Sequence, residues 1–471
     1  MSLIEELKKV LGDQNVLTGT DKERYSSDWL GQYRFEPLCV VRPASTEEVS
    51  KVVRLAGSFQ VNIVPVGGNT GLNGGTHSDD AISISMERMN KICEIRLNSK
   101  IAIVEAGVIL SNLHQLVNEN DLMFPLTFGA RGSATMGGVL STNAGGSNVL
   151  KYGNTRDLVL GVEIVLPSGE IMNLMSELHK DNSGYCLRDL VIGAEGTLGV
   201  ITKAVVKLFP KPRAYATAMI AVESLDSALA LLNELQDGTG GAVAAYEYMP
   251  KRYIQGHMQL SSFSKKPFKK DYEHLIMVEL ETTIELFSRY GDDGKVLLSV
   301  ELERILNKNL KKGFILDAHI AQNEEQRLIM WERREAAAEI SLLKNPLINN
   351  DIAVPLDKVS EFLTVMEKKL PELDAGADVL IVSHLGDGNV HYTVWPSNDD
   401  EKHKDKIMET IENVVLTLGG SFSAEHGIGL SKLSSMERRK DRVALDVMRQ
   451  IKNAIDPQGI MNPGKVLPKV H

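Results

Sequence analysis

Apolar and polar positions along the first half of the chain predict a series of short helices and strands. From Thr46 the segment TEEVSKVVRLAGSFQ has apolar residues at helical spacing behind a capping signal, so we expect an amphipathic helix. A short buried strand, VNIVPV, follows it, and LSNLHQLVNEN is expected to be helical. Further strands are expected at residues 81–86, 101–107, 161–170 and 198–210. The first 36 residues are expected to form a helical lead-in.

The segment FPKPR separates this half from a second half, in which predicted strands and helices follow one another in a different order. Two strand–helix–strand units follow, in residues 215–249 and 274–320. Such units predict an α+β architecture with a large antiparallel sheet. One long helix is expected over residues 323–344, and the tail from about residue 424 is Gly-rich and then helical.

Composition narrows the class of protein. The chain has 471 residues and a formal net charge of −10 with no long basic run, which argues against nucleic acid as a partner. Cys39, Cys93 and Cys186 form no CxxC pair, which fits a reducing compartment, so we expect a cytoplasmic protein. No apolar run approaches the ~20 residues that span a bilayer, so we expect no transmembrane segment.

Glycine is concentrated in three stretches, at residues 65–75, 132–157 and 193–202. Glycine leaves backbone N–H groups uncovered, so PVGGNTGLNGG in the first stretch suits a pyrophosphate. Its glycines do not have the spacing of the dinucleotide-binding fingerprint, and a strand rather than a helix is expected to follow. Taken alone, the first stretch fits a tight structural turn equally well.

A pair of histidines on a predicted hairpin suggests a metal site. In ADVLIVSHLGDGNVHYTVW, a two-residue Asp-Gly turn would place His384 directly opposite His391, close enough for both to bind one ion. The alternative is two surface histidines on an edge hairpin. Glu425 in SAEHGIG is the best candidate for a third ligand, and this set suits a divalent metal, with zinc favoured and redox metals open. His426 is then available as a general base, or else as a fourth ligand or a structural histidine.

The three Gly-rich stretches, taken together and in order, resemble the FAD-binding domain of the vanillyl-alcohol oxidase/para-cresol methylhydroxylase superfamily. The resemblance implies a two-part FAD-binding domain over residues 37–213, after the lead-in of residues 1–36, and then a substrate (cap) domain over residues 214–423 that carries the metal site. By the same resemblance, the residues that hold FAD are Pro65, Gly67, Gly68, Asn69, Thr70, Gly71 and Leu72 at the pyrophosphate, Ser133, Gly138, Asn143, Gly145 and Gly146 along the flavin, and Glu195, Gly196 and Ile201 on the adenosine side. His77 lacks the sequence context of relatives that attach flavin covalently, so we expect non-covalent FAD.

The motifs HLGDGNVH, AEHGIG and DPQGIMNPGK resemble the C-terminal half of the D-2-hydroxy acid dehydrogenases. That group includes D-lactate dehydrogenase, the glycolate oxidase D subunit and D-2-hydroxyglutarate dehydrogenase. The resemblance implies that His384, His391 and Glu425 bind the metal and that His426 is the base. It also implies that Asn462, in a segment of residues 424–471, returns to the flavin.

The same resemblance indicates how the substrate is held. Arg334 matches the substrate arginine of a W-x-x-R-E pattern, and an arginine can hold a carboxylate through two hydrogen bonds. Two positions depart from relatives that oxidise 2-hydroxyglutarate, because Asn349 stands where they have lysine and Thr393 where they have asparagine. Both positions are expected to bind substrate, so these departures put 2-hydroxyglutarate in doubt.

These patterns lead to one expected function with two alternatives. We expect an FAD- and metal-dependent dehydrogenase that oxidises a D-2-hydroxy acid, of the D-lactate or D-2-hydroxyglutarate type, by hydride transfer to flavin N5. The expected electron acceptor is a quinone or an electron-transfer flavoprotein, and a homodimer is left open. The alternatives are a peroxide-producing oxidase of the same superfamily and a non-redox protein with the flavin fold.

Overall fold

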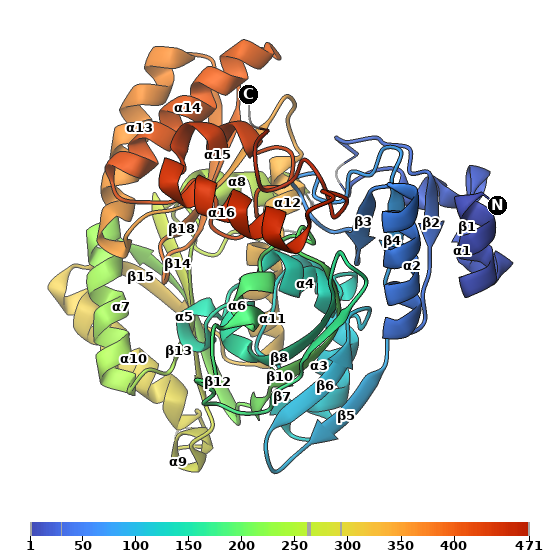
Figure 1. Cartoon of the computed structure of the whole chain (residues 1–471). Helices are drawn as coiled ribbons and strands as arrows, with labels where there is room; N and C mark the ends of the chain where they lie inside the picture. The colour runs from blue at the N-terminus through green and yellow to red at the C-terminus, as the bar shows by residue number, and fades with distance from the viewer. Residues whose placement is uncertain (1, 30, 261–264, 293, 470–471) are drawn as a thin grey trace.

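The computed structural model describes residues 2–29, 31–260, 265–292 and 294–469, and these contain three sheets of four or more strands (Figure 1). The first sheet has the strand order β1-β2-β4-β3, in which β2, β3 and β4 are parallel and β1 is antiparallel. Its elements are α1 (Leu3–Leu11), β1 (Val16–Leu17), β2 (Cys39–Val41), α2 (Thr46–Phe59), β3 (Ile63–Val66) and β4 (Ile82–Ser85).

The first 36 residues begin with a helix, as expected, and they also contribute a two-residue strand, β1, to this sheet. Val16 and Leu17 pair with Val41 and Val40, and the buried leucines of α1 join the same core as α2. A strand of two residues is too short to produce an alternating pattern, and for this reason the sequence did not reveal it.

The second sheet is antiparallel, with the order β5-β6-β10-β8-β9. Residues of α3, α4 and the strands beneath them share one apolar core. The elements of this part are β5 (Ile92–Arg96), β6 (Ile101–Glu105), α3 (Leu110–Asn118), β7 (Leu122–Met123), α4 (Met136–Thr142), α5 (Val149–Tyr152), β8 (Val159–Val165), β9 (Ile171–Leu174), α6 (Leu187–Val191), β10 (Val200–Lys207) and β11 (Phe209–Pro210), the last paired with β7.

The third sheet has seven antiparallel strands in the order β15-β12-β14-β13-β17-β18-β16. Four helices, α7, α10, α13 and α14, pack against one face through the largest apolar core (Figure 1). On the other face, α8, α11 and α12 cover part of the sheet through a smaller core, and the rest, the open face, borders the site. The elements are β12 (Ala214–Val222), α7 (Leu225–Thr239), β13 (Val243–Tyr248), α8 (Lys251–Leu260), β14 (His274–Thr282), α9 (Glu285–Ser288), α10 (Leu297–Lys312), β15 (Ile315–Ile320), α11 (Glu324–Glu335), α12 (Ala337–Ser341), β16 (Ile348–Ala353), α13 (Val359–Leu373), β17 (Asp378–His384), β18 (Asn389–Trp395) and α14 (Glu401–Thr417).

The single long helix expected over residues 323–344 is two helices, α11 and α12, that meet at Ala336. The hydroxyl of Tyr253 in α8 donates to the carbonyls of Arg333 and Arg334, at 2.8 and 2.9 Å. In a continuing helix, the carbonyls of Arg333 and Arg334 would accept backbone N–H groups four residues further along the chain. They bond the hydroxyl of Tyr253 at the point where α11 ends.

The chain returns to its beginning after α15 (Leu433–Arg439) and α16 (Arg442–Ile455). The N–H of Ile63 in β3 donates to the carbonyl of Ile460, and the N–H of Asn462 donates to the carbonyl of Ile63, both at 2.8 Å. Residues 460–462 therefore lie along the outer edge of the first sheet. Among the described residues, no helix is long and apolar enough to cross a membrane.

Candidate active site

A cavity of about 690 Å³ lies between the Gly-rich loops and the open face of the seven-stranded sheet. Most of the residues predicted to bind cofactor, metal or substrate line this one cavity. They are Pro65, Gly67, Gly68, Asn69, Thr70, Gly71, Leu72, Ser133, Gly138, Gly145, Glu195, Gly196, Ile201, Arg334, Asn349, His384, His391, Thr393, Glu425 and His426.

Three residues predicted to bind FAD are not among the residues that line the cavity: Asn143, Gly146 and Asn462. The side chain of Asn143 accepts a hydrogen bond from the backbone N–H of Arg156 at 2.8 Å. Asn462 donates from its side chain to the carbonyls of Glu195 and Gly75, at 2.7 and 3.1 Å. In this structure both asparagines hold backbone segments behind the cavity wall. His77 also lies outside the lining and stacks near Phe35.

Glycine is required by packing in the loop that follows β3. A Cβ added to Gly68 would lie 1.9 Å from the carbonyl oxygen of Ser133, and one added to Gly67 would lie 2.5 Å from Oγ1 of Thr135. No side chain fits between these two loops without moving the backbone. The loops therefore form a narrow wall of backbone along the cavity, as a cradle for a pyrophosphate requires.

Glu195, expected on the adenosine side, also connects the Gly-rich loops to the C-terminal segment. Its two carboxylate oxygens accept the backbone N–H groups of Ile428 and Gly429, at 2.7 and 2.8 Å. Burial raises the pKa of Glu195. This carboxylate fixes the loop that follows Glu425 and His426 against the FAD-binding half.

The histidine hairpin has a different register from the one predicted. His384 pairs with Asn389, and His391 pairs with Val382, so the loop contains the four residues 385–388. The N–H of Asp387 donates to the carbonyl of His384, and Gly388 adopts φ +82° where its carbonyl accepts the N–H of Val354. These contacts end the first strand two residues earlier than a two-residue turn would, while the second strand still begins at Asn389. Because the register differs by two residues, both histidines still point to the same face of the sheet, and their ring centroids are 5.5 Å apart.

Two buried carboxylates orient the histidines of this hairpin. Nδ1 of His384 lies 2.9 Å from Glu247 in β13, and Nδ1 of His391 lies 3.6 Å from Asp351 in β16. The Nε2 atoms are left facing Glu425, and each lies 3.9 Å from one of its carboxylate oxygens. Two imidazole nitrogens and one carboxylate thus converge, with a carboxylate behind each ring, which is the usual arrangement around a metal-binding histidine.

Arg334 is buried beside this group. Its Nε donates to Glu247 at 2.5 Å, and its Nη2 lies 3.2 Å from Nε2 of His384. Burial opposes protonation of His384, but Glu247 outweighs burial and raises the pKa of His384 to about 9. Burial lowers the pKa of His391 well below its ordinary value and raises the pKa of Glu425. These pKa shifts differ in sign because several ionisable groups are buried close together.

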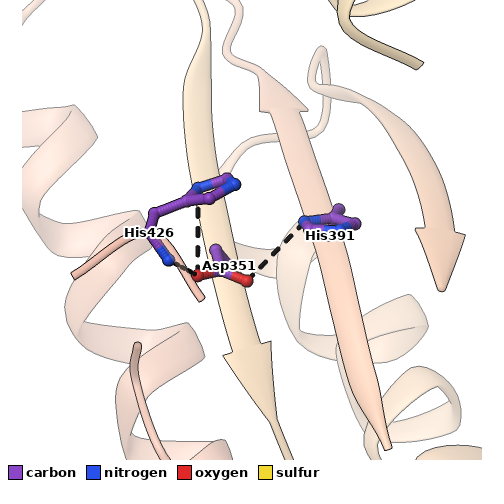
Figure 2. A group of neighbouring side chains, drawn as sticks. All are labelled: Asp351, His391 and His426. Carbon is purple, nitrogen blue, oxygen red and sulfur yellow. Dashed lines mark hydrogen bonds and ion pairs between the residues drawn. The ribbon is translucent and has the colours of Figure 1, made fainter. Parts of the chain in front are cut away.

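His426 is held at the edge of the cluster by Asp351 (Figure 2). One oxygen of Asp351 accepts the backbone N–H groups of Glu425 and His426, both at 2.8 Å, and lies 3.8 Å from Nδ1 of His426. The ring of His426 stacks on that of His391 at 20° and 5.5 Å. Burial lowers the pKa of His426, with Asp351 opposing it, and a lowered pKa favours the neutral imidazole, which can accept a proton.

Asp351 and Glu247 are the functional residues that sequence reasoning missed. The other oxygen of Asp351 accepts from the side chain of Asn389 at 2.9 Å, so this fully buried carboxylate is already saturated with donors and positions its neighbours. Each residue has a signal in the sequence, because a carboxylate lies within a segment that otherwise predicts a buried strand: YEY for Glu247 and NNDIAV for Asp351. A buried carboxylate requires a partner, but the sequence does not say which one.

Sequence profiles of known families match both halves of the chain. The profile described as "FAD binding domain" matches residues 37–175, and that described as "FAD linked oxidases, C-terminal domain" matches residues 211–466. Curated relatives match over nearly the full length. The D-2-hydroxyglutarate dehydrogenase of Stutzerimonas stutzeri is 31% identical over 99% of this chain and 98% of its own.

The chain belongs to the family of FAD-linked D-2-hydroxy acid dehydrogenases. The mitochondrial D-2-hydroxyglutarate dehydrogenase of Arabidopsis thaliana is 32% identical, covering 99% of this chain and 81% of the relative. Among solved structures, p-cresol methylhydroxylase with substrate bound superposes with a TM-score of 0.76 at 16% identity, over 98% of this chain and 96% of that one. The predicted α+β fold is therefore confirmed, and members of the family are oxidoreductases that use FAD.

Proposed function

We propose that the protein oxidises a D-2-hydroxy acid to the 2-oxo acid, with FAD and a divalent cation, most simply zinc, bound in the 690 Å³ cavity. One observation carries this proposal. His384, His391 and Glu425 converge on a point in the same cavity whose opposite wall is the glycine cradle. A redox cofactor and a cation-bound hydroxy acid would then share one enclosed space.

The donor groups fit both bound species. The backbone wall around Gly67 and Gly68 leaves no room for side chains, as close approach of a pyrophosphate demands. Two imidazoles and a carboxylate form the ligand set of catalytic zinc sites with an open position. FAD supplies the hydride acceptor, and the cation supplies Lewis acidity toward the substrate hydroxyl.

The side chains of the chain itself bind, orient and deprotonate the substrate. Arg334 faces the cavity beside the histidines and suits the substrate carboxylate. His426 accepts the hydroxyl proton at Nε2, because its Nδ1 faces Asp351. Asp351 keeps this imidazole in place, and its bonds to two backbone N–H groups fix Glu425 and His426 relative to each other.

The test is anaerobic mixing of the purified yellow protein with matched D- and L-2-hydroxy acids while the flavin absorbance is followed. We expect D-acids, and not their L-enantiomers, to bleach the flavin. Bleaching by no hydroxy acid would contradict the proposal and favour a non-redox protein with this fold. In air, rapid peroxide release would favour an oxidase, whereas slow release would agree with a quinone or an electron-transfer flavoprotein as acceptor.

A further inference from the structure

The open face of the seven-stranded sheet carries two rows of side chains that line the cavity. Strand pairing places Asp351, His391 and Val382 in one row. It places Asn349, Thr393 and Leu380 in the next row, roughly 7 Å further along the strands. All of these residues except Asp351 line the cavity. The second row therefore forms the wall next to the metal-binding side chains.

This second row contains no charge. Asn349 offers an amide, Thr393 a hydroxyl and Leu380 an alkyl group, and Oγ1 of Thr393 donates to Oδ1 of Asn349 at 3.3 Å. The amide N–H groups of Asn349 are thereby directed away from Thr393. Thr393 is almost completely buried, whereas Asn349 is exposed at the rim.

The cavity as a whole is short of positive charge. Of the described residues that line it, Arg334 is the only lysine or arginine, and its Nε is bound to Glu247. Four carboxylates line the same cavity: Glu195, Glu335, Glu339 and Glu425. Other cations near the cavity are already paired: Arg131 binds Glu335 at 2.6 Å, and Arg252 and Lys344 both bind Asp378 at 2.6 Å. None of the three is among the described residues that line the cavity.

We infer that the substrate is a D-2-hydroxy acid with a single carboxylate, and that Asn349 and Thr393 bind its uncharged side chain. This inference rests on the proposed function. The one carboxylate takes the available charge of Arg334 and the cation. A second carboxylate packed against the buried part of this row, at Thr393 and Leu380, would lose its water without gaining a cationic partner, which is costly. An amide, hydroxyl or alkyl group carries no such penalty there and can pair with the amide and hydroxyl present.

A matched pair of substrates tests this inference on the FAD- and metal-loaded enzyme. D-2-Hydroxyglutarate and its 5-amide have the same length and differ by one charge. We expect the second-order rate constant of flavin reduction to be at least tenfold higher for the amide. A higher value for the diacid would overturn the inference while leaving the proposed oxidation intact. Flavin reduction by no D-2-hydroxy acid would overturn both.

Variants at Asn349 sharpen the test, because this side chain lies at the exposed rim, where substitution is tolerated. Asn349→Lys should raise the ratio of diacid to amide rate constants at least tenfold, mainly through tighter diacid binding. Asn349→Asp should lower the same ratio. Asn453→Lys adds the same charge on the exposed surface of α16 and should leave the ratio unchanged. A ratio that does not respond to Asn349→Lys in a variant that retains FAD would show that this row does not contact the substrate side chain.

Discussion

The two walls of the cavity are built in different ways. The FAD-binding wall is mostly backbone, where Gly67 and Gly68 pack against Ser133 and Thr135 with no space for a side chain. The facing wall is a sheet whose side chains carry the chemistry, and buried carboxylates fix its histidines. The FAD-binding wall requires that no side chain fill the gap between its loops, whereas the sheet wall requires side chains held in defined positions. Substitutions should therefore damage the two walls in different and separable ways.

Loss of a metal-binding histidine should have the largest effect and should be confined to one wall. We expect His384→Ala, or chelation of the wild-type enzyme, to remove the cation and reduce turnover below detection, because two ligands hold a cation poorly. FAD should stay bound, since the glycine cradle does not involve His384. Metal analysis, flavin absorbance and turnover measure the three quantities. His319→Ala, an exposed histidine of the same sheet, is the matched control. Full activity in metal-free enzyme would contradict the proposed site.

Removal of the proposed base should have the second-largest effect on activity. His426→Ala should slow flavin reduction by about 10²–10⁴-fold, which is the usual contribution of a positioned base. Metal content and substrate affinity should change little if the proposed set of His384, His391 and Glu425 holds the cation, rather than the neighbouring group of Asp351, His391 and His426. Stopped-flow reduction and metal analysis separate these effects. Loss of the metal in this variant would identify His426 as a ligand and leave the base to be found elsewhere.

Substitution of Glu247, the carboxylate that bonds Nδ1 of His384, should have a smaller but measurable effect on metal binding. Glu247→Gln should weaken metal affinity by about 10–100-fold, because partners behind metal-binding histidines typically contribute this much. Calorimetric titration of the folded variant measures the change. Glu279→Gln is the control, since Glu279 is also buried and paired with an arginine, Arg327 at 2.7 Å, but bonds neither His384 nor His391. Equal loss of metal affinity in both variants would indicate general destabilisation of the sheet.

The backbone wall should respond through stability and flavin retention. Gly68→Ala should lower the free energy of unfolding by about 1–3 kcal/mol, as overpacking typically does, because its Cβ would lie 1.9 Å from a carbonyl oxygen. Gly71→Ala meets no atom within 4 Å and should destabilise the fold less. Thermal unfolding and the FAD content after purification measure both. Equal stability of the two variants would show that the loops separate more easily than their packing indicates.

The contrast between the walls also explains what the sequence could reveal. Glycine clusters stand out in a linear sequence, so Gly67 and Gly68 could be predicted as site residues, and both line the cavity. The faces of β17 and β18 were also predictable, because side chains alternate with a period of two and a two-residue change of register leaves His384 and His391 on the same face. The exact pairing was not predictable, since it depends on the contact of Gly388 with Val354, a residue distant in the sequence.

Residues that act through long-range partners were the least predictable. Asp351 and Glu247 gain their roles only when strands far apart in the sequence pair with the hairpin. Asn143 and Asn462, which motif resemblance assigns to the flavin, bond backbone groups of neighbouring segments and are not among the residues that line the cavity, so their place at the flavin stays a prediction. A motif identifies residues that belong to a site without separating those that line it from those that support it.

The return of residues 460–462 to the edge of β3 has a consequence for how the protein is made. The backbone hydrogen bonds of Ile63 are completed only after Ile460 has been synthesised, and the two residues are separated by almost the whole chain. At ribosomal rates of about 5–20 residues per second, β3 emerges roughly 20–80 s before its last partner. An unpaired strand edge can associate with other chains during that interval. We therefore expect nascent chains to require protection of this edge until residues 460–462 can pair with it.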